Sequence, residues 1–200
     1  MYIGNDIVDI NLALENFKKK KVRSHQYTLS PSERDKFKTF IEKDIHFWVL
    51  WSMKEALYKS YVKAGLRTRF EPAKLELLAI VQKSPHQFIA YASDGQRKYL
   101  VNTSLYLGVV HSISYEEKVK EQNILYRHKA IVNDDYATQY QKVRQLAMTL
   151  LPCRGEKEWT IKKDVYHVPQ LLLDDKQSPH ELSLSHHGNY VAAAIHLKDY

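Results

Sequence analysis

Residues 46–64, HFWVLWSMKEALYKSYVKA, decide the fold of this chain. Wound as a helix, this segment places apolar side chains on most of its sides, and a helix of that kind is buried in a protein core. Asp44 is a residue type that favours a helix N-terminus, and Gly65 is one that ends helices. The pattern therefore predicts a buried helix between these two residues, with the other elements packed around it.

Three charged residues lie in the middle of this apolar helix. Glu55 and Lys59 are four residues apart and share one face, whereas Lys54 is about 100° further round. On an exposed helix, Glu55 and Lys59 would be an ordinary surface ion pair. On a buried helix each charge needs a partner, which indicates a polar pocket that holds a charged ligand.

The segments around this helix alternate between extended and helical patterns. A strand pattern covers Tyr2–Ile10, and Ser30, Pro31 and Glu33 form a capping box that should begin a helix running to about Ile41. After the long helix, strands are predicted at Leu75–Val81, Phe88–Ser93, Lys98–Asn102 and Leu105–Ile113, with Asp94-Gly95 as a hairpin turn.

The remaining third of the chain has a similar order of elements. The polar stretch Tyr115–Asn133 has no clear period and is predicted to be partly a connection, followed by a helix from Tyr136 to Leu150. Short strands are predicted near Trp159–Lys162, Val165–Leu173, Leu182–Ser185 and Tyr190–Leu197. Helices followed by strands, twice over, predict an α+β protein of two pseudo-equivalent halves, which we place at residues 1–118 and 119–200.

Composition narrows the class of protein. Apolar residues make up 44% of the 200 residues, and the net charge of +7 favours anionic partners. Cys153 is the only cysteine, so neither an internal disulfide nor a Cys-rich zinc site is possible. The first ten residues lack the pattern of a signal peptide, and no run is apolar enough for a membrane helix. We therefore expect a cytoplasmic protein without membrane segments.

Two further segments carry candidate functional residues. Asp6 follows Gly4 in the opening strand, where glycine allows close approach of another backbone; a strand end with Asp6 in a turn is the alternative. Ser185 and His186 end a strand before a turn, and a polar loop is again the alternative. Adjacent Ser and His residues do not readily form a nucleophile–base pair, and no G-x-S-x-G motif is present.

The order of these three segments is more specific than any of them alone. Gly4-Asn5-Asp6-Ile7, the Trp51-x-x-Lys-Glu-Ala-x-x-Lys59 segment and Ser183-x-Ser-His186 resemble the three motifs of the 4′-phosphopantetheinyl transferase superfamily. The motif order resembles that of the short holo-(acyl carrier protein) synthases, while the length resembles that of the two-halved surfactin-type members. The resemblance implies a single-chain pseudodimer with the two halves in permuted order, active as a monomer.

The resemblance also implies roles for six residues. Asp6 and Glu55 would bind Mg²⁺, and these two residues with Lys59 would be catalytic. Lys54 and Lys59 would neutralise phosphate, and Ser185 and His186 would hold the nucleotide of coenzyme A from the other half. Surfactin-type members often have a second acid two residues after the Asp, where this chain has Val8; we do not expect Asp9 to replace it, because it faces the other side of the strand.

The implied reaction transfers phosphopantetheine from coenzyme A to a serine of an apo acyl or peptidyl carrier protein, as in fatty-acid or polyketide biosynthesis. An inactive module that binds coenzyme A or a carrier protein is the alternative within the family. A basic nucleic-acid-binding domain is an alternative from another class, but the sequence contains no recognised nucleic-acid motif.

Overall fold

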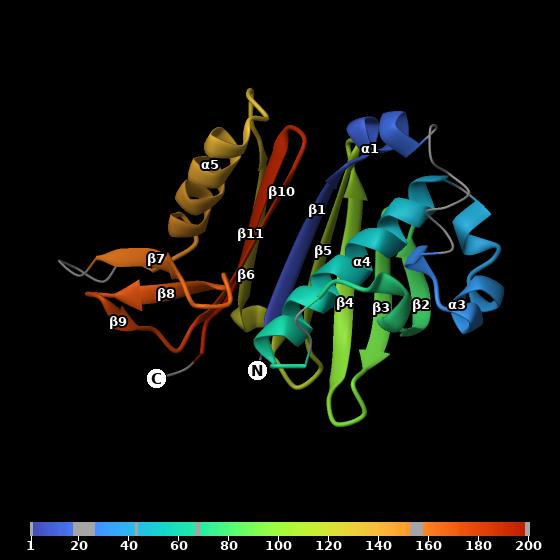
Figure 1. The fold of residues 1–200 in the computed structure, drawn as a ribbon, viewed down its shortest axis with the longest axis horizontal. Helices are drawn as coiled ribbons and strands as arrows, with labels where there is room; N and C mark the ends of the chain where they lie inside the picture. The colour runs from blue at the N-terminus through green and yellow to red at the C-terminus, as the bar shows by residue number, and fades with distance from the viewer. Residues whose placement is uncertain (1, 18–26, 43, 67–68, 153–157, 199–200) are drawn as a thin grey trace.

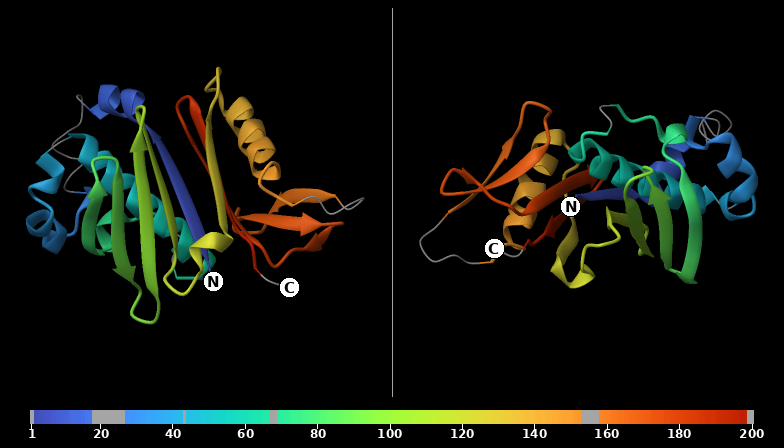
Figure 2. Two further views of the ribbon diagram at one scale, coloured as in Figure 1. Left: turned by 180° about the vertical axis from the view of Figure 1, so that it is seen from behind. Right: turned by 90° about the horizontal axis from the view of Figure 1, so that it is seen from below.

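A computed structural model describes residues 2–17, 27–42, 44–66, 69–152 and 158–198, which leaves Cys153 outside the described residues. The chain is an α+β protein with antiparallel sheets, as the sequence predicts (Figure 1). A five-stranded sheet has the order β1-β5-β4-β3-β2, and a three-stranded sheet has the order β10-β11-β6. A third small sheet, β7-β8-β9, projects at the end of the molecule far from α3 (Figure 2).

The five-stranded sheet belongs to the first part of the chain. Its strands are β1 (Ile3–Asp9), β2 (Leu77–Ser84), β3 (Gln87–Ser93), β4 (Lys98–Tyr106) and β5 (Val109–Glu116). The helices of this part are α1 (Ile10–Phe17), α3 (Pro31–Lys36) and α4 (Asp44–Lys63), with short 3₁₀ turns at Phe40–Glu42 and Pro72–Lys74.

The second part of the chain forms the two smaller sheets. Its elements are a 3₁₀ turn at Glu121–Asn123, β6 (Ile124–Ala130), α5 (Tyr136–Met148), β7 (Trp159–Lys163), β8 (Pro169–Leu173), β9 (Lys176–Gln177), β10 (Glu181–His187) and β11 (Tyr190–His196). Asp135 caps α5 by accepting a hydrogen bond from the Thr138 backbone N–H.

The predicted buried helix is α4, which packs across the first sheet. It lies chiefly over β1 and β5, and its apolar residues belong to the main core cluster together with inward-facing residues of β3 and β4. The helix ends in a Schellman motif, in which Gly65 N–H donates to Val62 O and Leu66 N–H donates to Tyr61 O, with Gly65 at φ +72°. The predicted capping box at Ser30 and Glu33 is also present.

Several predicted boundaries were wrong: the helix expected to run to about Ile41 ends at Lys36, and the strand expected at Val165–Leu173 begins at Pro169. The predicted strand Leu105–Ile113 is interrupted by a two-residue turn at Leu107-Gly108, where both residues have positive φ, and β5 begins at Val109. A leucine at the first position hides the turn from sequence reasoning, because such hairpins usually show Asn-Gly or Asp-Gly. The polar stretch predicted to be partly a connection also contains a strand that was not predicted, β6, whose residues beyond Leu125 are exposed and therefore lack an apolar pattern.

The five-stranded sheet and the sheet β10-β11-β6 share one plan. Each has a first strand paired to the last strand of a hairpin, in the order β1-β5-β4 and β6-β11-β10, and each hairpin closes with a two-residue turn. Val109 opposes Asp9 and Tyr106, while Tyr190 opposes Ala130 and His187. This correspondence supports two halves of similar plan, whereas the boundary between residues 118 and 119 stays a prediction.

The two halves pack with β1 against β10 and β11 (Figure 1). The sheet faces opposite the helices meet in two small apolar clusters, one around Ile3, Ile113 and Ala194 and the other around Ile7 and Ala192. We call the line where β1 (Ile3–Asp9) meets β10 (Glu181–His187) the seam. Residues of α4 and α5 line a common pocket beside the seam, so side chains from both halves can act on one ligand.

Candidate active site

Gly4 brings α4 into direct contact with β1. A Cβ atom on Gly4 would lie 2.0 Å from the backbone oxygen of Ala56 and 2.9 Å from the backbone nitrogen of Ser60. No side chain fits at these distances, since real Cβ contacts stay above about 3.0 Å. The glycine thus lets the strand touch the helix, so that Asp6, on the same face of β1, meets the polar face of α4.

Asp6, Lys59 and Glu55 form the centre of the site. The Lys59 Nζ atom donates to Asp6 Oδ1 at 3.2 Å and lies 3.5 Å from Glu55 Oε1. It also donates to the backbone oxygen of Asn5 at 2.8 Å. Asp6 is buried, Lys59 is half-buried, and the Glu55 side chain is 31% exposed. The structure thus brings together three residues that lie as much as 53 positions apart in the sequence.

The electrostatics of this centre favour a bound cation. Burial, and then the neighbouring Glu55 carboxylate, raise the pKa of Asp6 to about 8, against the lowering effect of Lys59. Asp6 Oδ2 is buried and has no hydrogen-bond partner. Two carboxylates, one with an unsatisfied oxygen, are the hard oxygen donors that Mg²⁺ prefers, and Mg²⁺ usually takes only one or two carboxylates. The described residues contain no group of three or more His, Cys, Asp and Glu side chains suited to a metal.

Lys54 is not part of this centre. It is fully buried on the other side of α4, where its Nζ atom donates to Glu33 Oε2 and to the Pro72 backbone oxygen. Burial lowers the pKa of Lys54, while Glu33 opposes the shift. Breaking a buried ion pair typically destabilises a protein by about 3–5 kcal/mol. The structure thus gives Lys54 a role in fixing α3 against α4 and places it away from any phosphate at Asp6.

Ser185 and His186 lie on opposite faces of β10. Ser185 is buried at the seam, and its Oγ atom has no hydrogen-bond partner. His186 faces outward into a pocket of about 270 Å³, beside Tyr136 at a ring distance of 5.8 Å. Lys59 lines the same pocket from α4, so His186 and Lys59 face one space from the two halves. Burial, followed by nearby Lys59, lowers the pKa of His186.

A comparison with known protein families matches residues 2–115 to the model named ACPS, the 4′-phosphopantetheinyl transferase superfamily. The matched segment is more than half of the chain and includes Asp6, Glu55 and Lys59. The chain belongs to this superfamily. Searches of curated proteins and of solved structures found no match. Superfamily membership indicates a transferase and suggests phosphopantetheinyl transfer.

The match ends before the second half of this superfamily member, so His186 is linked to the site by geometry and motif, and Ser185 by the motif alone. Around His186, the pocket of about 270 Å³ has cationic side chains from three elements: Lys59, Lys63, Arg144, Lys163. Arg144 stacks on the Tyr140 ring at 3.5 Å. A pocket that combines cations with aromatic rings suits an anionic ligand with a flat base.

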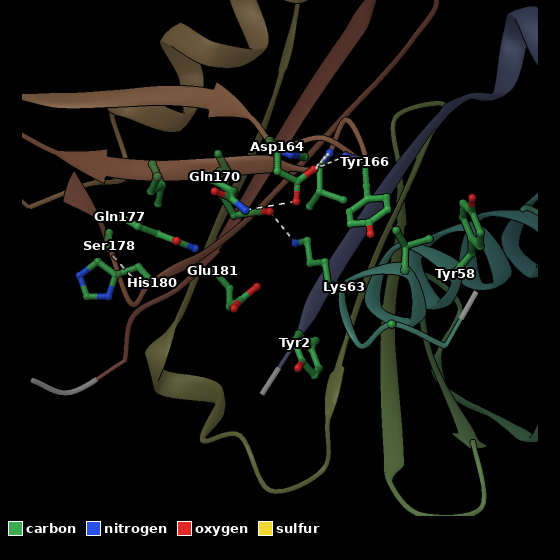
Figure 3. A pocket seen from close by; sticks show the side chains of 16 residues that line it. Tyr2, Tyr58, Lys63, Asp164, Tyr166, Gln170, Gln177, Ser178, His180 and Glu181 are labelled. Atoms are coloured by element: carbon green, nitrogen blue, oxygen red, sulfur yellow. Dashed lines mark hydrogen bonds between the residues drawn. The ribbon is translucent and has the colours of Figure 1, made fainter. Parts of the chain in front are cut away.

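A second pocket, of about 630 Å³, adjoins the first at the C-terminal end of α4 (Figure 3). Both pockets are lined by Tyr58, Val62 and Lys63, and the second extends to Glu181 and His180.

No helix in the described part of the chain is both long and apolar enough to cross a membrane.

Three residues at the seam were not predicted from the sequence to have a role: Ser183, His187 and Lys63. The Asn5 backbone N–H donates to Ser183 Oγ at 2.8 Å, and the Asp9 N–H donates to His187 Nδ1 at 3.0 Å. The Lys63 Nζ atom donates to the backbone oxygens of Ile3 and Leu182. The strand pattern places Ser183 and His187 on the Ser185 face, but a sequence does not show which backbone groups that face will meet. As expected, Asp9 lies on the opposite face of β1 from Asp6, against Gly188.

Proposed function

We propose that this protein transfers the 4′-phosphopantetheine group of coenzyme A to a serine of an apo carrier protein, in a Mg²⁺-dependent reaction. The observation that carries the proposal is Lys59, which contacts the buried Asp6 and Glu55 and also lines one pocket with His186 of the other half, in a chain of this superfamily. Phosphoryl transfer depends mainly on positioning and on neutralising charge, and the pocket offers both.

Asp6 and Glu55 fit the role of Mg²⁺ ligands in this proposal. Asp6 Oδ2 has no hydrogen-bond partner, and burial, followed by the neighbouring Glu55 carboxylate, raises the pKa of the Asp6 carboxyl group; a bound cation would offset both effects. When bound, Mg²⁺ would neutralise the pyrophosphate of coenzyme A. Lys59 would neutralise phosphate charge, because it lines the pocket beside the two carboxylates, whose own charge the metal would take up.

In the proposed reaction, the carrier serine Oγ forms a bond to the β-phosphorus of coenzyme A. The bond from that phosphorus to the oxygen bridging to the α-phosphorus breaks, and adenosine 3′,5′-bisphosphate leaves with the electron pair. The serine proton passes to a base, for which the partly exposed Glu55 carboxylate is our candidate. His186, with the cationic side chains beside it, would orient the nucleotide from the second half.

The pathway, location and assembly of the protein form part of the proposal. We propose a carrier protein of fatty-acid or polyketide biosynthesis as the acceptor and the cytoplasm as the location. We also propose that the protein is active as a monomer, since one chain supplies residues to the pocket from both halves. Sedimentation of the active protein as an obligate trimer would contradict the last point.

The experiment that tests the proposal is incubation with coenzyme A and a panel of apo carrier proteins, read by intact mass. At least one carrier should gain the mass of phosphopantetheine with Mg²⁺ or Mn²⁺, and none should gain it when the metal is chelated. A known transferase assayed in parallel shows that each carrier is competent. If that enzyme succeeds and this protein modifies no carrier, an inactive binding module becomes the better account.

A further inference from the structure

The edge of β1 that faces the second half is satisfied by side chains. In the described structure β1 pairs with β5 alone, so its other edge presents backbone N–H and C=O groups to β10 without a strand ladder. Unpaired backbone groups at a buried edge cost free energy unless another group bonds to them. Four of these edge groups, two N–H and two C=O, bond to side chains that come from both halves.

The two N–H groups bond to residues of β10. Asn5 N–H donates to Ser183 Oγ, and Asp9 N–H donates to His187 Nδ1. Both pairs are four residues apart on their strands, so β1 and β10 run in the same direction and stay in register along the seam. Because His187 Nδ1 accepts a hydrogen bond, the ring carries its proton on Nε2, and burial favours this neutral form by lowering the pKa of His187.

The two C=O groups bond to lysines of α4. Lys59 donates to Asn5 O, and Lys63, one helical turn later, donates to Ile3 O at 2.6 Å. Lys63 also donates to Leu182 O of β10, so a single ammonium group ties α4 to both strands of the seam. Burial lowers the pKa of Lys63 to about 8.

We propose that Ser183, His187 and Lys63 are positioning residues that set the width of the cleft between the two halves. A direct ladder would bring β1 and β10 to about 4.8 Å and close the seam. Side chains inserted between the strands hold them in register but further apart. His186 lies on β10 between the two residues that bond to β1, so their contacts fix its distance from Asp6.

The proposal deepens the proposed function, since the cleft is where that function places coenzyme A. The proposal assigns the bond from Asp9 N–H to the Nδ1 atom of His187 and not to Nε2. Asparagine places an acceptor oxygen near the position of Nδ1, whereas glutamine places it near that of Nε2. His187→Asn should therefore keep the bond to Asp9 N–H, and His187→Gln should lose it.

Two measurements on the full-length protein test this distinction. Calorimetric titration with coenzyme A and Mg²⁺ should show affinity near wild type for His187→Asn, and a loss on the order of tenfold for His187→Gln and for Ser183→Ala. Amide hydrogen exchange read by NMR should be faster at Asp9 in His187→Gln and at Asn5 in Ser183→Ala, and unchanged at Asp9 in His187→Asn.

The two measurements separate this proposal from the proposed function. If coenzyme A does not bind to the wild type, the proposed function fails, but the exchange rates at Asn5 and Asp9 still test the seam. If His187→Asn and His187→Gln have the same exchange rate at Asp9, the positioning role is wrong. Faster exchange without any change in coenzyme A affinity would also overturn it, because the seam would then be purely structural.

Discussion

The strands β1 and β6 hold corresponding places in two sheets of the same order, yet only β1 carries a candidate metal ligand, Asp6. Through the registers of the two hairpins, Gly4 corresponds to Leu125, and Asp6 corresponds to Arg127. Asp6 is buried, whereas Arg127 is exposed. An acidic residue in β1, Asp6, is thus replaced by a basic one, Arg127, in β6. The glycine of β1 is replaced by a leucine.

This difference changes how each helix lies on its sheet. With glycine at position 4, α4 packs chiefly on β1 and β5, and its polar residues reach Asp6. With leucine at position 125, α5 packs chiefly on β11 and β10 and makes little contact with β6. The same scaffold therefore builds a polar centre only where the first strand lets the helix touch it.

The largest effect is expected from removing the acid of the first half. Asp6→Asn should reduce carrier modification by on the order of a hundredfold or more, because a metal clamp contributes several kcal/mol of charge stabilisation. Arg127→Asn, at the corresponding place in β6, should leave the rate near that of the wild type. The measurement is the rate of mass gain by a carrier protein at saturating coenzyme A.

Thermal unfolding of both variants serves as the control for that comparison. Asp6→Asn should be at least as stable as the wild type without metal, since it removes a buried carboxylate whose pKa is already raised. Equal rates for Asp6→Asn and the wild type would remove Asp6 from the site. An equally large loss in Arg127→Asn would mean that the second half contributes a charge that the structure does not indicate.

A smaller effect is expected at the glycine of the same strand. Gly4→Ala should destabilise the protein by on the order of 3 kcal/mol, because the new methyl group collides with backbone atoms of α4 that cannot rotate away. Leu125→Ala is the matched change in β6 and should cost less, since Leu125 is only half-buried. The measurement is urea unfolding of both variants.

Activity sharpens the same comparison. If α4 shifts to accommodate the methyl group of Gly4→Ala, Glu55 and Lys59 move away from Asp6, and carrier modification should fall in the fraction that remains folded. A Gly4→Ala variant with full stability would show that the close approach of α4 to β1 is not required.

The sequence predicts the first half better than the second, for a physical reason. The α4 pattern, its Schellman end at Gly65 and the capping box at Ser30 are local signals, because each depends on residues close together in the chain. Strand β6 gives no such signal, since it is an edge strand whose side chains are mostly exposed. Its existence follows from pairing with β11, which the sequence does not reveal.

The same limit applies to the site. The spacing of Glu55 and Lys59 predicts that they share a helix face, and the structure joins them to Asp6. The position of Lys54, one step round α4, does not predict its partner, because Glu33 comes from a different helix. In the sequence, Lys54 and Lys59 both lie on a helix predicted to be buried, and nothing distinguishes their roles. The structure distinguishes them, because Lys54 bonds to Glu33 in the core and Lys59 lines the pocket.

The smallest effect expected is a pH dependence of stability at the face where the halves meet. There the first half has His111, and the corresponding residue of β11 is Ala192. Burial, followed by the neighbouring His128, lowers the pKa of His111 from 6.5 to about 3. His111 therefore takes up a proton near pH 6.5 in the unfolded chain but stays neutral in the folded chain down to about pH 3. Its contribution to the free energy of unfolding is present above pH 6.5 and is lost as the pH falls towards 3.

Between pH 7 and pH 5 this loss should amount to about 2 kcal/mol, because at pH 5 the unfolded histidine is mostly protonated and the folded one is not. His111→Gln removes the titration, so its free energy of unfolding in urea should fall less over this range than that of the wild type. His128→Gln is the matched control and should change the slope less, since His128 is exposed, whereas His111 is buried. Parallel curves for the wild type and His111→Gln would show that His111 is protonated in the folded state, and that acid does not act on this face through it.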